Sequence, residues 1–470
     1  MRSHRIAFAL VLAIVLAGPA AAQQAPPAPG EPRDFKLSET TTFDLPNGMK
    51  VTLAPYGWIP KATVQLVVRT GNIDESADET WLADLTGDLM MEGTTSRTGR
   101  EIALEAARMG GRVNVGTGLD ETTVGGDALA EFTPDLVRLV AEIARRPSFP
   151  ASEMPRLQAD MVRNVMVAKS QPQQIALEKF RQVMYGDHPY GRVFPTPEMI
   201  QGFTVEQVKA FHAGHFGAAR AHLYVAGRFD RSAVETAVRE AFGDWEAGTP
   251  FQNTPAQPAS ERKIHLVDRP GAVQSTVYLG VPVEVDPSHA DWVPLQVTNS
   301  LLGGSFNSRI TSNIREDKGY TYSPFSQVSS RYRDAYWVEV ADVTTAVTGA
   351  SLEEIFKEVD RLQAEPPSEE ELRGIQNFMA GIFVLQNSSP GGIVGQLRFV
   401  NLHGLDPSYL TGYVSKVYAV TPAEVRRVAA THIDDADMMM VVAGDVVQIR
   451  DQLAPFGTIV EPASPPLRRE

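Results

Sequence analysis

Two apolar runs occur in the same local context along the chain, which indicates a repeated unit. The runs are His222–Gly227 and Met439–Gly444, and each is typical of a buried strand. Each run follows a segment of helical character that begins with a threonine, Thr204 in the first case and Thr421 in the second. The two threonines and the ends of the two runs are both 217 residues apart. The pattern therefore predicts two homologous halves that arose by duplication.

The other periodic segments place short strands and long helices in both halves. Thr63–Val68 and Ser275–Leu279 are short and rich in β-branched residues, which favours strands. Ser152–Ala168 and Ser368–Leu385 have the length and spacing of helices. Groups of strands mixed with groups of helices predict an α+β fold, in which helices cover a sheet within each half.

Proline-rich and apolar segments divide the chain further. The first residues combine a basic start at Arg2 and Arg5, an apolar stretch and the small residues Ala20–Ala22, which is the pattern of a signal peptide cleaved after Ala22. The chain is therefore expected to be exported, and the periplasm is the expected compartment. The predicted organisation is a signal peptide (1–22), a proline-rich leader (23–34), a first α+β domain (35–246), a linker (247–261), a second α+β domain (262–458) and a tail (459–470).

Composition limits the classes of function. The chain has 470 residues with 43% hydrophobic content, more than one core usually supports, and it has no cysteine. Disulfides and thiolate metal sites are therefore excluded. The formal net charge is −14 and no basic cluster is present, which argues against nucleic acid as a partner. No run after the signal peptide is long enough to span a membrane, so peptides or another protein are the expected partners.

The segment Trp81–Thr94 resembles the zinc-site helix of the pitrilysin/insulinase metallopeptidases, which include the mitochondrial processing peptidase. That family carries an inverted His-x-x-Glu-His motif, and Asp84, Gly87 and Asp88 occupy the positions of the first ligand, the general base and the second ligand. Further segments match the family in order along the chain: Leu45–Val51, Gly71-x-x-x-Glu75, Gly110–Thr117, His188–Arg192, Leu302–Arg309 and Arg315–Tyr322.

The resemblance implies two homologous α+β halves that are joined by a linker and close as a clamshell. It also implies a third ligand, a glutamate, between Asp160 and Asn164, where the sequence has none. Without ligands and base, this chain is expected to bind no cofactor, and zinc is expected in a partner subunit. Asp84 and Asp88 lie one helical turn apart and could hold a hard cation, which leaves an active enzyme with a divergent metal site as a minor alternative.

The resemblance assigns roles to three further residues. Active members carry an Arg and a Tyr seven residues apart that reach the peptide carbonyl at the zinc, and Arg315 and Tyr322 reproduce that spacing. Asn114 is implied to contact the substrate. A guanidinium donates charge-assisted hydrogen bonds and a phenol stabilises an oxyanion, which suits these roles. The alternative is that Arg315 caps a helix and Tyr322 is a core residue. The pair His212 and His215, at the end of a helix, is expected to be structural.

Two functions from different classes follow. The first is the non-catalytic subunit of an exported heterodimeric zinc metallopeptidase, which binds peptide and contributes Arg315 and Tyr322 to the active site of a zinc-bearing subunit of the same family. The second is a stand-alone peptide-binding or scaffold protein with the same fold and no hydrolysis. A neighbouring gene for an intact His-x-x-Glu-His relative would favour the first.

Overall fold

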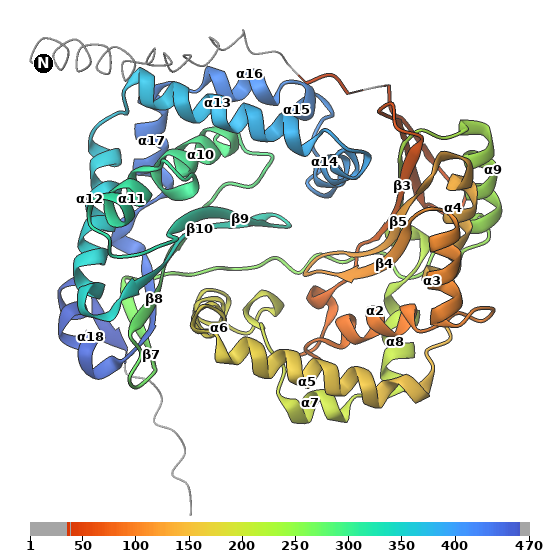
Figure 1. Cartoon of the computed structure of the whole chain (residues 1–470), viewed down its shortest axis with the longest axis horizontal. Helices are drawn as coiled ribbons and strands as arrows, with labels where there is room; N and C mark the ends of the chain where they lie inside the picture. The colour runs from red at the N-terminus through yellow and green to blue at the C-terminus, as the bar shows by residue number, and fades with distance from the viewer. Residues whose placement is uncertain (1–34, 38, 461–470) are drawn as a thin grey trace, which may run out of the picture. The chain divides into compact units, whose positions relative to one another are not determined.

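The computed structural model describes residues 35–37 and 39–460 (Figure 1). The predicted signal peptide and leader and the last ten residues of the predicted tail fall outside the described residues. The described chain contains two six-stranded mixed sheets, each covered by helices, so the predicted α+β fold with two related halves is confirmed. None of the described helices combines the length and the apolar character needed to cross a membrane.

The two sheets have matching strand orders. The first is ordered β1-β2-β6-β3-β5-β4 and the second β12-β7-β11-β8-β10-β9. The parallel pair of β2 with β6 corresponds to the parallel pair of β7 with β11, whereas the edge strand β1 is antiparallel to β2 and the edge strand β12 is parallel to β7. The strands are β1 (Thr41–Asp44), β2 (Lys50–Pro55), β3 (Lys61–Val68), β4 (Arg112–Thr117), β5 (Thr122–Leu129), β6 (Ala221–Gly227), β7 (Lys263–Asp268), β8 (Gln274–Pro282), β9 (Phe325–Arg331), β10 (Asp334–Thr344), β11 (Met439–Gly444) and β12 (Thr458–Val460).

The helices follow the same duplication. Those of the first half are α2 (Leu82–Met91), α3 (Gly99–Arg108), α4 (Thr133–Arg145), α5 (Met154–Ser170), α6 (Pro172–Tyr185), α7 (Pro197–Gly202), α8 (Val205–His215) and α9 (Arg231–Phe242). Those of the second half are α10 (Trp292–Asn299), α11 (Arg309–Thr311), α12 (Thr348–Ala364), α13 (Glu369–Gln386), α14 (Pro390–Leu402), α15 (Ser408–Thr411), α16 (Tyr413–Ala419), α17 (Pro422–His432) and α18 (Val446–Leu453), with π-helical turns η6 (Ser300–Gly304) and η7 (Ser312–Asp317).

The two helices that revealed the repeat begin in the same way. Thr204 accepts a hydrogen bond from the backbone of Gln207 at the start of α8, and the Gln207 side chain bonds back to the Thr204 backbone. Thr421 and Glu424 make the same reciprocal capping box at the start of α17. Each box satisfies two N–H groups that the first helical turn would leave unpaired. The threonines therefore define where these helices start, as the sequence predicted.

Strand β11 is apolar at every position, and β6 is apolar apart from His222 and the hydroxyl of Tyr224, because both faces of each sheet are buried. In β11, Met440 and Val442 pack in the core with α12 and α17, whereas Met439, Val441 and Ala443 pack in a second core on the opposite face. In β6, Leu223 and Val225 face the helices of the first half, whereas Ala226 faces the other way. Burial on both faces is the physical reason for continuous apolar runs instead of alternation.

The second face of each sheet is covered by a helix from the other half. Helix α6 of the first half packs Ala176, Phe180 and Met184 against β8, β10 and β11. Helix α14 of the second half packs Ile393, Val394 and other apolar residues against β3 and β6. Figure 1 shows α6 beside β7 and β8, and α14 on the side of β3. The halves therefore exchange one covering helix each.

Close packing at this exchange requires a glycine on the sheet. The ring of Phe180 lies over Gly280 of β8, where a Cβ atom would approach the ring to 2.5 Å. Phe180 also contacts the rings of Tyr278 and Tyr336 at centroid distances of 5.6 and 5.4 Å. An aromatic cluster of this kind adds about 0.5–1.5 kcal/mol per pair to the free energy of burial. The missing side chain at Gly280 thus lets α6 approach the sheet.

The predicted linker and the first residues of the predicted tail are both in contact with the rest of the fold. Residues 243–262 form no helix or strand, in the region predicted to be a linker, and Phe251 within it stacks on the guanidinium of Arg69 at 4.3 Å. The predicted tail was set to begin at residue 459, but Ile459 and Val460 continue β12, which pairs in parallel with β7. Backbone pairing therefore extends the sheet two residues beyond the predicted boundary, because the apolar Ile459 packs against the second core.

One carboxyl group is buried in the second half without a partner. Glu339 lies on β10 with no exposed surface, and neither of its oxygens has a hydrogen-bond partner among the described residues. The backbone of Gly303 approaches it so closely that a Cβ there would lie 2.6 Å from Oε2. Burial raises the pKa of Glu339 well above its usual value. Burial without a partner therefore favours the uncharged form of this side chain in the folded protein.

Glu339 should make stability depend on pH. Between the ordinary carboxyl pKa and the raised one, the folded chain binds one proton more than the unfolded chain, so the free energy of unfolding falls by about 1.4 kcal/mol per pH unit as pH rises. We expect Glu339→Gln to remove this loss. In urea unfolding, the free energy of unfolding of the variant minus that of the natural chain should therefore increase from pH 4 to pH 8. Glu353→Gln, at an exposed position of α12, is the matched control. A stability difference that does not change with pH would contradict a neutral Glu339.

Candidate functional site

Helix α2 carries the positions that correspond to the zinc motif, and Glu75 holds its N-terminus. The carboxylate of Glu75 accepts hydrogen bonds from the backbone N–H of Ala83 at 2.8 Å and of Trp81 at 3.1 Å. It also accepts one from the side chain of Asn72 at 3.1 Å. Burial raises the pKa of Glu75 to about 8, and the negative charge of Asp84 adds to the increase. The first turn of α2 is therefore capped from outside the helix.

Asp84, in the position of the first zinc ligand, is occupied by a contact within the protein. Its Oδ2 accepts a hydrogen bond of 2.7 Å from the side chain of Asn72. Burial raises the pKa of Asp84 to about 6, against the opposing effect of this hydrogen bond. Asn72 thus contacts both Glu75 and Asp84 and connects the cap of the helix to its ligand position.

Asp88, in the position of the second ligand, belongs to a cluster of carboxylates arranged around Arg156 of α5. The guanidinium of Arg156 lies 2.6 Å from Glu92, 2.9 Å from Glu153 and 3.5 Å from Asp160. Burial and the charge of Glu92 raise the pKa of Asp88, and the charge of Arg156 opposes them. A guanidinium of the chain itself therefore offsets part of the negative charge in this region.

The segment expected to carry the third ligand lies on α5 and supplies no glutamate. Asp160, at its start, forms a second ion pair with Arg163 at 2.8 Å. Nowhere in 35–37 and 39–460 do three or more His, Cys, Asp or Glu side chains gather closely enough to hold a metal ion. Structural and catalytic zinc sites need three or four such donors, so the residues at α2 and α5 do not fit zinc.

The position of the general base is filled by a neighbouring side chain. A Cβ atom at Gly87 would lie 2.7 Å from Oγ1 of Thr117 and 3.1 Å from a methyl group of Val115, both on β4. The Thr117 hydroxyl donates a 3.3 Å hydrogen bond to the carbonyl of Ala83 on α2. Strand β4 therefore packs against the helix where a glutamate side chain would have to stand.

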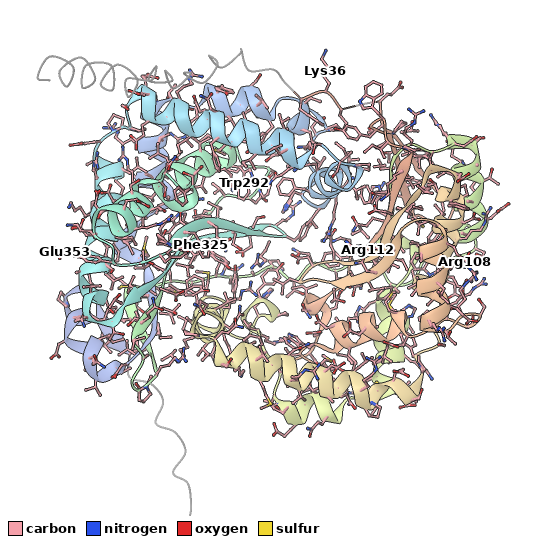
Figure 2. All side chains as sticks on the ribbon, in the orientation of Figure 1. Lys36, Arg108, Arg112, Trp292, Phe325 and Glu353 are labelled. Atoms are coloured by element: carbon pink, nitrogen blue, oxygen red, sulfur yellow. The ribbon has the colours of Figure 1, made fainter. Side chains whose placement is uncertain are left out.

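Asn114 lies on β4, which is an edge of the first sheet. It is exposed and faces Gly125 of β5, the only strand paired with β4 among the described residues. Strand β9 is the corresponding edge of the second sheet. Figure 2 labels Arg112 and Phe325, the first residues of β4 and β9. An edge strand offers unpaired N–H and C=O groups, which an extended peptide can bind as an added strand.

Arg315 and Tyr322 come together as the sequence spacing suggested. The Arg315 guanidinium carbon lies 5.4 Å from the ring centroid of Tyr322, and it lies closer, at 4.2 Å, to the ring of Phe306. Its Nε forms an ion pair of 3.2 Å with Glu316. Tyr322 is 78% exposed, so it is not the core residue of the alternative interpretation.

Part of the Arg315 guanidinium has no hydrogen-bond partner among the described residues. Within 35–37 and 39–460, its terminal nitrogens make no hydrogen bond, so Arg315 does not cap a helix through its side chain. No hydrogen bond, ion pair or ring contact between described residues links Arg315 or Tyr322 to Asp84, Asp88 or Asn114. The structure therefore shows two separate groups, one around α2 and β4 and one around η7.

Sequence reasoning did not single out Phe306, Thr117 or Arg156. Phe306 and Thr117 stand inside matched motifs, but Thr117 packs against the distant helix α2, and Phe306 contacts Arg315, which belongs to a different motif. Arg156 precedes the expected third-ligand segment and has no motif. One local signal could have identified Phe306, namely an exposed aromatic residue that lies next to a turn.

The two histidines of α8 make separate contacts. His212 Nε2 lies 2.8 Å from the carbonyl oxygen of Ala144, and its ring stacks on Phe216 at 4.5 Å. His215 Nδ1 lies 3.6 Å from Asp74. Burial lowers the pKa of both histidines. Their contacts agree with the expected structural role.

Comparison with protein families identifies two matching profiles. The insulinase profile (peptidase family M16) matches residues 57–198, and the profile of the peptidase M16 inactive domain matches residues 202–379. The two matches together cover more than half of the chain. The first includes α2 and β4, and the second includes Arg315, Tyr322 and Phe306.

Individual relatives are distant in sequence. An uncharacterized zinc protease of Rickettsia felis is 23% identical, covering 73% of this chain and 82% of its own. One of Mycobacterium bovis is 26% identical, covering 78% and 82%. Similar solved structures include a peptidase M16 inactive domain from Pseudomonas fluorescens (23% identity, 87% and 98% covered, TM-score 0.79) and Complex III2 from Candida albicans (14%, 88% and 98%, TM-score 0.73). These structures share the fold.

The packing at Gly87 can be tested by a pair of substitutions. Alanine in a helix is favoured over glycine by about 0.5–1 kcal/mol, but the new Cβ at Gly87 meets Thr117, and overpacking costs about 1–3 kcal/mol. We expect Gly87→Ala to lower the free energy of unfolding in the natural chain and to raise it in a Thr117→Ala background. Gly214→Ala in α8, where a Cβ meets nothing within 4 Å, should be stabilising and is the control. Equal stabilisation by Gly87→Ala and Gly214→Ala would contradict the filled position.

Proposed function

The chain belongs to the M16 insulinase family of peptidases, and on this basis we propose that it is the non-catalytic subunit of an exported heterodimeric zinc peptidase. In this proposal a related partner subunit carries the intact His-x-x-Glu-His motif and the zinc. This chain binds no metal, binds peptide substrate and contributes Arg315 and Tyr322 to the active site of the partner. Export rests on the pattern of residues 1–22 and the periplasm is the proposed compartment.

The observation that carries the proposal is the difference between the two groups of residues. Around α2, the helix and its cap are present, but the positions of the zinc motif are engaged by other side chains. Asn72 binds Asp84, Thr117 fills the space beside Gly87, and Arg156 pairs with nearby carboxylates. Around η7, in contrast, Tyr322 is exposed, and the terminal nitrogens of the partly buried Arg315 make no hydrogen bond to the described residues. A chain that retains only the second group is suited to complete a site that another subunit begins.

Peptide binding is supported by the edge of the first sheet. Among the residues that the structure describes, strand β4 is paired on one side only, and the exposed Asn114 lies in its centre with an amide that can donate to and accept from a peptide backbone. Main-chain pairing along such an edge does not depend on the sequence of the peptide. The net charge of −14 adds a general preference for substrates that are not acidic.

The chemistry of Arg315 and Tyr322 suits the charge that develops during peptide hydrolysis. A guanidinium donates charge-assisted hydrogen bonds to a carbonyl oxygen, and these strengthen as the oxygen becomes negative. The phenol of Tyr322 can donate one more hydrogen bond to the same oxygen. Donors that strengthen in the transition state lower the barrier of the reaction more than they tighten substrate binding. The partner's zinc would supply the activated water.

A stand-alone scaffold is the second candidate. The similarity to Complex III2 from Candida albicans shows that this fold also occurs in a respiratory complex. The described residues hold no group of side chains that fits zinc, which suits this candidate equally well, but this candidate gives no role to the free donors of Arg315 or to the exposed Tyr322. A divergent metal site at Asp84 and Asp88 is a weaker candidate, because Asn72 binds Asp84 and Arg156 offsets part of the surrounding negative charge.

The proposal predicts that activity appears only when two chains are mixed. The isolated chain should contain far less than one zinc per molecule and should not hydrolyse peptides, because it lacks the ligands and the base. Mixing it with an intact His-x-x-Glu-His relative from the same organism should give a complex in size-exclusion chromatography and a large increase in peptidase activity. Elemental analysis and a fluorogenic peptide assay measure both results. A stable complex without added activity would favour the scaffold.

Within the active complex, Arg315→Ala and Tyr322→Phe should each lower kcat by roughly ten- to a thousandfold, the range for losing one donor to an oxyanion. KM should change little, since the donors act mainly in the transition state. Arg239→Ala is the matched control, because Arg239 lies over the ring of Phe43 at 5.1 Å in the first half. Unchanged kcat in both variants, with complexes of normal stability, would reject a contribution of this chain to catalysis.

A further inference from the structure

Phe306 is an exposed aromatic residue that contacts the candidate catalytic arginine. It follows the π-helical turn η6 and is 65% exposed. Its ring centroid lies 4.2 Å from the guanidinium carbon of Arg315, closer than the ring of Tyr322 at 5.4 Å. A guanidinium over the face of a phenyl ring is attracted by the electrons of the ring, so this contact couples Phe306 to Arg315.

The turn that carries Phe306 is held firmly on both sides. Ser308 caps α11 by accepting a hydrogen bond from the backbone of Thr311, and its own N–H bonds to the carbonyl of Ser305. Arg309 forms a two-pronged ion pair with Glu371 of α13, at 2.7 and 2.9 Å. A bidentate pair of this kind fixes geometry as well as charge. The ring of Phe306 therefore projects from an ordered support.

The other contact of Arg315 cannot fix the guanidinium in the same way. Its ion-pair partner Glu316 is the next residue in the chain, and the Glu316 side chain is 58% exposed. Exposed ion pairs are weak and are screened by salt. The Arg315 side chain itself is only 23% exposed, because aromatic rings take up much of its surroundings. The rings are thus the main constraint on its orientation.

We propose that Phe306 is a positioning residue, whose ring holds the guanidinium of Arg315 so that its terminal nitrogens meet the carbonyl oxygen of the scissile peptide bond. This inference rests on the proposed function, because it concerns the same contribution to a partner's active site. The guanidinium is planar, so a ring stacked on one face leaves the hydrogen-bonding edge free. Stacking therefore orients Arg315 without occupying its donors.

The geometry can be tested on the isolated chain, without any partner. In ¹⁵N-edited NMR of arginine side chains, the Nε–H signal of Arg315, assigned through Arg315→Lys, should be displaced by the ring current of Phe306. Phe306→Leu should remove this displacement and Phe306→Tyr should keep it. An unchanged signal in Phe306→Leu would overturn the proposal, whether or not the chain has a catalytic partner.

The consequence for catalysis is tested in the active complex. Phe306→Leu should lower kcat about five- to fiftyfold with little change in KM, because a donor displaced by about 1 Å loses much of its effect. Phe306→Tyr should restore kcat to within about threefold of the natural complex, since it keeps the ring. In the Arg315→Ala background, Phe306→Leu should cause no further loss, which separates positioning from a general structural role.

The outcomes distinguish this inference from the proposed function. If Arg315→Ala lowers kcat and Phe306→Leu does not, the positioning role is wrong and the proposed function stands. If Arg315→Ala has no effect on kcat, the proposed function fails and the catalytic part of the positioning role fails with it. If Phe306→Leu lowers kcat equally in the presence and absence of Arg315, Phe306 acts through another route and the proposal is overturned.

Discussion

The exchange of covering helices between the halves is the constraint on which this structure depends. Each six-stranded sheet has one face buried by helices of its own half and the other buried by a single helix from the opposite half, α6 on the second sheet and α14 on the first. A sheet with one such face exposed would present Val441, Val338 or Val67 to water. Each Å² of apolar surface exposed in this way would cost about 25 cal/mol. The halves therefore stabilise each other and form a single compact unit.

Polar contacts fix the positions of α6 and α14 on the sheets that they cover. Tyr185 at the end of α6 donates a 2.5 Å hydrogen bond to Asp334 of β10. Arg398 of α14 pairs with Glu121, which is buried beside the first sheet. Burial raises the pKa of both Asp334 and Glu121. Buried pairs of this kind contribute little net stability, but they penalise any packing that leaves one member alone.

Much of the fold was predictable from local chemistry, and the covering helices were not. Thr204 and Thr421 mark their helices because a capping threonine acts through residues three positions away. The continuous apolar runs of β6 and β11 correctly indicated burial on both faces. The residues that bury the second face come from α14 and α6, which look like ordinary amphipathic helices. In the candidate site, the replacement of the ligands was visible at Asp84, Gly87 and Asp88. The filling of that space by Thr117 and the charge pairing by Arg156 depend on contacts between distant segments, which no single motif records.

The order of elements along the chain has a consequence for how the protein is made. The first sheet receives its last strand, β6, by Gly227, but α14, which covers its second face, begins only at Pro390. About 160 residues must be synthesised between these points, which takes roughly 10–30 s at typical elongation rates. During that time the apolar face of the first sheet has no cover of its own. If the chain is exported, it benefits from reaching its destination unfolded, because folding can then start when both covering helices are present. A helper protein that shields this face during synthesis would serve the same purpose.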